Sequence, residues 1–224
     1  MFIKVKLIIF ANTNQDKETQ TARIMSYTMQ DMESYYQQLM SYFQREEYKT
    51  TSNKDRAHNT TMLRFMLDNS NTVKMFCGEM SVFRNKFYDT IDRDNQACAD
   101  DDSEGLGQTL KKKLITSLEN FINDSNSHLD IILESYSSEY LEDLIDCNLF
   151  KDGIKNKKIT LRYLDLDRIQ TRYLSHFSFT DKKILRMETN KSTHEGICGF
   201  NIDQEIFDDM NKNFKIFTEA SISI

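Results

Sequence analysis

The chain has 224 residues, of which 39% are hydrophobic and 29% charged, and its formal net charge is −6. These values fit a soluble globular protein with one core, and the acidic balance argues against broad nucleic-acid binding. No segment approaches the ~20 consecutive apolar residues of a membrane span, so no membrane partner is expected.

Cysteine usage favours a reduced, cytoplasmic setting. The cysteines lie far apart and form no Cys-x2-Cys pair, which excludes a zinc ribbon or a redox dithiol: Cys77, Cys98, Cys147 and Cys198. The histidines are equally scattered and form no metal-binding spacing: His58, His128, His176 and His194. The sequence therefore predicts neither a metal site nor a cofactor.

The N-terminal sixty residues are predicted to form a strand and a helical arm. Residues 1–11 alternate Lys4 and Lys6 with apolar residues, which indicates a strand or a disordered start, and their apolar run is too short for a secretory signal. Residues 17–49 carry an apolar stripe at helical spacing that includes Ile24, Met32 and Leu39. Residues 50–61 are polar and are predicted to be a loop.

The middle of the chain alternates predicted strands and helices, an order that favours right-handed parallel crossovers. Strands are expected over residues 72–77, 129–134 and 158–164. Helices are expected over residues 60–68, 82–91, 108–123 and 139–147. Ser81 and Ser138 are interpreted as caps of the helices that follow them.

Charge is distributed unevenly along the chain. Residues 89–104 carry seven acidic residues against Arg93 alone and are interpreted as a solvated loop, since their spacing departs from a calcium-binding loop. Residues 151–191 carry eleven Lys or Arg against five acidic residues, a local charge of +6. A phosphate-bearing ligand could use this basic region. Solvation of strand ends and turns is the preferred interpretation, because no regular basic helix or interleaved aromatic platform accompanies these residues.

The segment from Leu174 to Glu188 has two alternating runs around a polar centre, which indicates a β-hairpin. A two-residue loop would place Phe177 and Phe179 on the face of Arg186 and Glu188. A three-residue loop over residues 181–183 places both phenylalanines with Leu185 and Met187 instead, and this register is preferred because it separates apolar from polar residues.

The preferred register gathers His176, Ser178, Arg186 and Glu188 on one face. His176 then lies across from Glu188, and Ser178 lies across from Arg186. Such a group could be a chemical site. It could also be a structural network, since buried histidines bonded to carboxylates are common in both settings.

Three features of this region resemble a known family. They are His176 followed by Asp181 in the hairpin, Arg186-x-Glu188, and Gly199-Phe200-Asn201 leading into a predicted helix over residues 203–218. The last hundred residues resemble the C-terminal half of a phospholipase D-like domain, whose active motif is His-x-Lys-x4-Asp. Here Ser178 stands in place of the motif lysine and Lys183 in place of its aspartate, and Arg186-x-Glu188 is similar to degenerate members of the family.

The resemblance implies an N-terminal arm over residues 1–60 and a phospholipase D-like domain over residues 61–224. The predicted fold class is α/β, with a mixed sheet that has a parallel core and an antiparallel hairpin, helices on both faces, and an N-terminal helical arm. The order of the strands is not predicted.

Two functions remain open at this point. The first is a non-catalytic phospholipase D-like domain that works through protein association, including self-association as a homodimer. The second is a metal-independent phosphodiesterase or nuclease, in which His176 attacks phosphorus and Glu188 orients its ring. In that reading Lys182, Lys183 and Arg186 bind phosphate.

Overall fold

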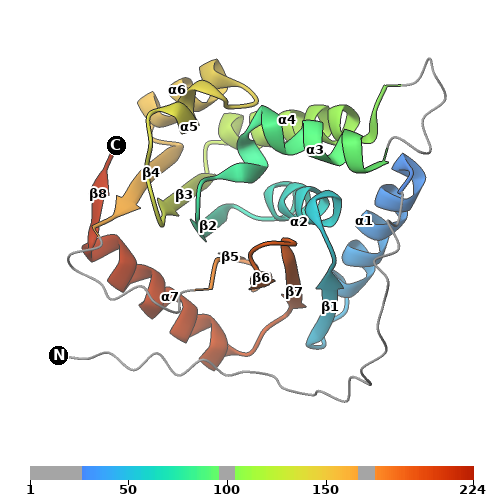
Figure 1. The fold of residues 1–224 in the computed structure, drawn as a ribbon. Coiled ribbons are helices and arrows are strands. Elements are labelled where there is room, and N and C mark those ends of the chain that lie inside the picture. Colours follow the sequence, from blue (N-terminus) through green and yellow to red (C-terminus); the bar gives the residue numbers. More distant parts are fainter. Residues whose placement is uncertain (1–26, 96–103, 166–174) are drawn as a thin grey trace.

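The computed structural model describes residues 27–95, 104–165 and 175–224. Within these residues one mixed sheet has the strand order β1-β7-β6-β5-β2-β3-β4-β8 (Figure 1). Its strands are β1 (Lys49–Asn53), β2 (Thr72–Cys77), β3 (His128–Leu133), β4 (Ile159–Leu164), β5 (Phe177–Thr180), β6 (Leu185–Asn190), β7 (Glu195–Phe200) and β8 (Ser221–Ser223). The predicted α/β class is confirmed.

The helices lie on both faces of the sheet, as predicted (Figure 1). They are α1 (Met29–Phe43), α2 (Arg56–Asp68), α3 (Asn85–Asn95), α4 (Leu106–Asn123), α5 (Glu139–Glu142), α6 (Cys147–Lys155) and α7 (Gln204–Glu219), with a 3-10 turn η1 (Ser81–Phe83). In the described part of the chain, none of these helices combines the length and apolar character needed to span a membrane.

The centre of the sheet is the predicted parallel core of β2, β3 and β4. Its central strand, β3, buries Leu129 and the run Ile131–Leu133 completely, as a strand covered on both faces requires. One face packs against α1 to α4 and α6. The other face packs against α7 through an aromatic cluster that includes Phe76, Phe177 and Phe217.

The hairpin has the three-residue loop that the sequence analysis preferred. Phe177 pairs with Met187 and Ser178 with Arg186, and the amide of Thr180 donates to the carbonyl of Ile184. Lys183 closes the turn with φ 58°, a left-handed conformation that three-residue hairpin loops commonly contain. Phe177 and Phe179 therefore face α7, and the polar face turns toward α2.

The expectations for the N-terminal part need two corrections. The prediction of one helix over residues 17–49 is too long, because the described residues of this range contain only α1 (Met29–Phe43) as a helix. Ile24 lies outside the described residues. The predicted loop over residues 50–61 is wrong, because it contains most of β1 and the start of α2. β1 is recognisable only by its pairing with β7, and α2 begins where Asp55 caps it. The division of the chain at residue 60 stays a prediction.

Two predicted helices are also divided. The helix expected over residues 82–91 is η1 followed by α3, and Ser81 starts η1 without capping it through its side chain. The helix expected over residues 139–147 ends at Glu142, and α6 follows with Asp146 as its cap. An isolated β-bridge pairs Arg84, between η1 and α3, with Leu144, between α5 and α6. No local pattern predicts this contact.

Candidate functional site

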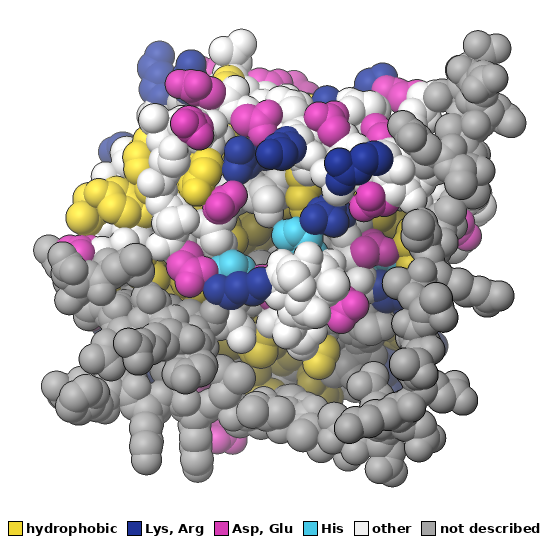
Figure 2. All heavy atoms as spheres, viewed as in Figure 1, with side chains coloured by type: hydrophobic (Ala, Val, Ile, Leu, Met, Phe, Trp, Pro, Cys, Tyr) yellow, Lys and Arg dark blue, Asp and Glu magenta, His cyan; other side chains and the backbone are white. Residues whose placement is uncertain are grey.

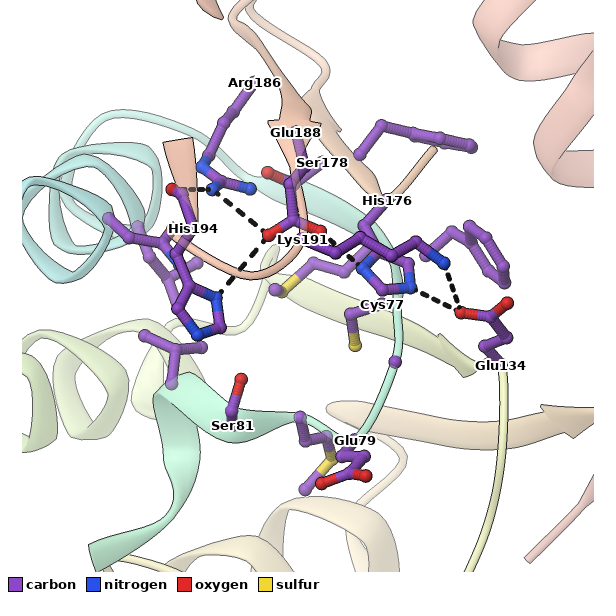
Figure 3. Close-up of a pocket in the computed structure, with 18 of the residues that line it drawn as sticks. Cys77, Glu79, Ser81, Glu134, His176, Ser178, Arg186, Glu188, Lys191 and His194 are labelled. Carbon is purple, nitrogen blue, oxygen red and sulfur yellow. Dashed lines mark hydrogen bonds and ion pairs between the residues drawn. The ribbon is translucent and has the colours of Figure 1, made fainter. Parts of the chain in front are cut away.

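A cavity of about 400 Å³ opens at the carboxyl ends of β2 and β3, the edge of an α/β sheet where ligands usually bind. Cys77 and Gly78 follow β2, and Glu134 follows β3. Because β5 runs antiparallel to β2, His176 arrives at the same edge directly before β5. Figure 3 shows these side chains gathered around the cavity.

His176 and Glu188 form the centre of the site. The Nδ1 atom of His176 lies 2.6 Å from Oε2 of Glu188, and the amide of Glu188 donates to the carbonyl of His176. The Glu188 side chain is only 5% exposed. The hairpin register thus brings together the two residues that the sequence analysis placed across from each other.

The second ring nitrogen of His176 is also engaged. Its Nε2 atom lies 2.7 Å from Oε2 of Glu134, and the same oxygen accepts a hydrogen bond from Nζ of Lys191, also at 2.7 Å (Figure 3). Both contacts of the imidazole are therefore with carboxylates. Neither Glu134 nor Lys191 is among the site residues that the sequence predicts. The available signal for Glu134 is its position at the end of a predicted buried strand.

Arg186 and His194 surround the far side of Glu188. Nη2 of Arg186 lies 3.8 Å from Oε1 of Glu188 and donates to the backbone carbonyl of His194. Nδ1 of His194 lies 3.6 Å from the same Glu188 oxygen. Arg186 is buried beside this carboxylate and lines the cavity, and its Nε atom has no hydrogen-bond partner among the described residues.

The carboxylates of the site are held in their charged forms. Burial alone would raise the pKa of Glu188, but hydrogen bonds with His176 and His194 and the charge of Arg186 outweigh it and lower that pKa to about 2. Burial opposes the same shift at Glu134, where hydrogen bonds from Lys191 and His176 nevertheless lower the pKa. Burial raises the pKa of the Cys77 thiol to about 12, which keeps it protonated and a poor nucleophile.

The remaining residues of the predicted polar face and hairpin turn supply no free positive charge to the cavity. Ser178 lines it but is buried, and its hydroxyl contacts the sulfur of Met66. Lys182 and Lys183 lie in the hairpin turn, beyond the length of β5, which is about 13 Å at 3.3 Å per residue. Lys182 is close to Asp181 there, with 3.7 Å between their charged groups.

Several cations of the basic region also have structural partners. Arg162 binds Asp130 at 2.7 Å across β4 and β3, and Lys158 donates to the carbonyls of Asp124 and Ser125. Arg168 and Arg172 lie outside the described residues. Of this region, Lys191 and Arg186 reach the cavity.

No family model and no curated protein matches the chain. Among solved structures, it is similar to Nuc from Salmonella typhimurium, a phospholipase D family member, with a TM-score of 0.46 and 8% identity over 80% of this chain and 99% of Nuc. It is also similar to TrmBL2, an archaeal chromatin protein described as having a novel mode of DNA binding, with a TM-score of 0.43 and 12% identity over 83% of this chain. The chain covers 56% of TrmBL2, little more than half its length.

Proposed function

We propose that this chain is a phospholipase D-like domain without phosphodiesterase activity, which works by binding protein chains, including a second copy of itself. The observation that carries the first half of the proposal is the engagement of both ring nitrogens of His176 by Glu188 and Glu134. A histidine nucleophile needs an available lone pair on one nitrogen. Here each ring nitrogen already has a carboxylate partner.

The charge balance of the cavity supports the same conclusion. Phosphoryl transfer requires positive groups aimed at the oxygens on which negative charge develops. Lys191 is paired with Glu134 and Arg186 with Glu188, while Glu79 adds a further acid to the lining. The cavity therefore lacks the uncompensated positive charge that a phosphodiester in its transition state would need.

The second half of the proposal rests on the outer strand β8. We define the β8 edge as the apolar group Tyr136, Tyr163, Ile222 and Ile224, in which Tyr163 is half-buried and the other three are exposed. The rings of Tyr136 and Tyr163 stack with their centroids 5.4 Å apart, and Tyr163 pairs with Ile222 across β4 and β8. Figure 2 shows hydrophobic side chains gathered on the side of the molecule where β4 and β8 lie in Figure 1.

Unprotected strand edges favour pairing with another chain. Proteins that avoid such pairing usually place charged residues or proline on an edge strand, and the sequence Ser221-Ile-Ser-Ile224 has neither. Two copies of β8 can pair antiparallel about a two-fold axis, which would bury Ile222 and Ile224 and continue the sheet. A homodimer through the β8 edge is the simplest such assembly.

Ile222→Lys tests this assembly, because it places a charge on the edge while the side chain is already 39% exposed in the monomer. We expect the dimer dissociation constant to rise at least about tenfold, measured by sedimentation equilibrium. Ile197→Lys is the matched control, since Ile197 is 42% exposed on β7, away from this edge. A monomeric wild-type protein, or equal effects of the two substitutions, would contradict the homodimer.

A second candidate function is supported by one observation. The buried Glu188 carboxylate orients His176 so that Nε2 points toward the cavity, which is the arrangement a histidine nucleophile requires. In a phosphodiesterase of this kind, Glu134 would have to leave Nε2 before the ring could attack phosphorus.

Hydrolysis assays separate the two candidates. We expect purified protein to cleave neither a generic phosphodiester nor single-stranded DNA above the level of His176→Ala, with or without a chelator. Chelator-resistant turnover that disappears in His176→Ala would refute the non-catalytic proposal and establish His176 as the nucleophile.

A further inference from the structure

One oxygen atom of Glu134 bridges two nitrogen donors on the wall of the cavity. His176 Nε2 and Lys191 Nζ each lie 2.7 Å from Oε2 of Glu134. These donors come from different parts of the hairpin region, since His176 precedes β5 and Lys191 lies in the turn between β6 and β7 (Figure 3). When the His176 ring carries a proton on Nε2, two N–H donors converge on one negative oxygen, which is an oxyanion-binding arrangement.

We propose that this position is a binding seat for the oxyanion of a small ligand, and that Glu134 is an internal ligand which occupies the seat until that molecule displaces it. The inference rests on the proposed function only in that His176 does not attack phosphorus. An incoming oxyanion would accept the same two hydrogen bonds that Glu134 accepts, so the seat needs no new donors.

The two carboxylates that contact the His176 ring, Glu134 and Glu188, differ in how easily a ligand could displace them. The side chain of Glu134 is 26% exposed and follows the end of a strand, and its partner Lys191 is 49% exposed in a turn. Partly exposed ion pairs contribute little net stability, so turning Glu134 toward solvent costs little. Glu188 is 5% exposed and is held by the hairpin, Arg186 and His194, so it stays and keeps the imidazole oriented.

The rest of the cavity indicates the class of ligand. Its apolar wall is formed by Leu63, Met75, Met80 and Val82. Glu79 also lines the cavity, but its carboxylate is paired with Arg84 at 3.2 Å. Among the lining residues Lys191 is the one exposed cation, so the cavity offers no second cation to another anionic group on the ligand. A volume of about 400 Å³ suits a small molecule. The seat therefore fits a monoanion with an apolar body, whose oxyanion is a carboxylate or a phosphodiester.

Glu134→Ala tests the seat directly, with butyrate and diethyl phosphate as the two probes in titration calorimetry. We expect at least one probe to bind about tenfold more tightly to Glu134→Ala than to the wild type, because the internal competitor is absent. The preferred probe distinguishes a carboxylate from a phosphodiester ligand. Unchanged affinity for both probes would overturn the proposal.

Glu79→Ala is the matched control, because it removes one negative charge from the same cavity but vacates no contact of His176. Equal tightening in both variants would mean that only the local charge matters, and would also overturn the seat. Adding Lys191→Ala to Glu134→Ala should abolish the gain. If Glu134→Ala does not fold, Glu134→Gln keeps the shape of the side chain and should show a smaller gain in the same direction.

The outcomes for this seat and for the proposed function are distinguishable. Phosphodiester turnover by the wild type would refute the non-catalytic proposal, and tighter probe binding by Glu134→Ala would still support the seat. Absence of that gain would refute the seat but leave the lack of catalysis unaffected.

Discussion

Among the described residues, His58 and His176 each have a carboxylate oxygen within 3 Å of Nδ1, and their surroundings give the two pairs different capacities to bind a ligand. His58 lies 2.9 Å from Asp55 and its side chain is 7% exposed; His176 lies 2.6 Å from Glu188 and its side chain is 14% exposed. The two histidines are similarly buried, but the carboxylate of Asp55 is 34% exposed and that of Glu188 only 5% exposed. The pairs also differ in what surrounds the second ring nitrogen, Nε2.

The His58 pair is local and structural. Asp55 caps α2 by accepting the amide of His58, and the His58 ring packs edge-on against Tyr27 and Tyr35. The partners of His176 come from further away, Glu188 from the paired strand and Glu134 from the end of β3. A histidine–carboxylate pair can therefore bind a ligand only where the fold turns the second nitrogen toward a cavity.

The largest effect that we expect in this comparison is the decrease in unfolding free energy when Glu188 is replaced. Glu188→Ala leaves Arg186 buried without its carboxylate, and removing one partner of a buried ion pair costs about 3–5 kcal/mol of unfolding free energy. Urea denaturation of the variant against the wild type measures this change. A loss below about 1 kcal/mol would mean that Arg186 does not depend on Glu188.

Asp55→Ala is the matched substitution at the other pair. It removes a helix cap and one partner of His58, and we expect a smaller loss of about 1–2 kcal/mol in the same denaturation experiment. A larger loss of unfolding free energy for Asp55→Ala than for Glu188→Ala would reverse the comparison, because the half-exposed carboxylate would then contribute more stability than the buried one.

The next effect is the pH dependence of stability that Glu188 produces. Its pKa is about 2 in the folded protein and about 4.5 otherwise, so its contribution is complete above about pH 4.5 and is lost as the pH falls toward 2. The shift corresponds to roughly 3 kcal/mol at most, from 1.36 kcal/mol per pKa unit. The difference in unfolding free energy between wild type and Glu188→Gln should therefore shrink over this pH range in urea denaturation. A difference that is constant with pH would contradict the assignment.

The parts of the fold that the sequence predicted depend on local periodicity. The buried runs of β2, β3 and β4 alternate with helical stripes, and the hairpin separates apolar from polar residues in only one register. Because that register is local, it also predicted that His176 lies across from Glu188. The N-terminal prediction failed at β1, whose sequence Lys49-Thr-Thr-Ser-Asn53 has no apolar alternation and becomes a strand only by pairing with β7.

The sequence by itself determined the α/β class, the hairpin register and the central histidine–carboxylate pair, because each follows from the spacing of residues close together in the chain. Only the tertiary structure decided the order of the strands, and with it the arrival of Glu134 and Lys191 at His176. It also placed Lys182 and Lys183 at the opposite end of β5 from the cavity. Contacts between strands far apart in the sequence depend on how whole elements pack, and no local pattern encodes that packing.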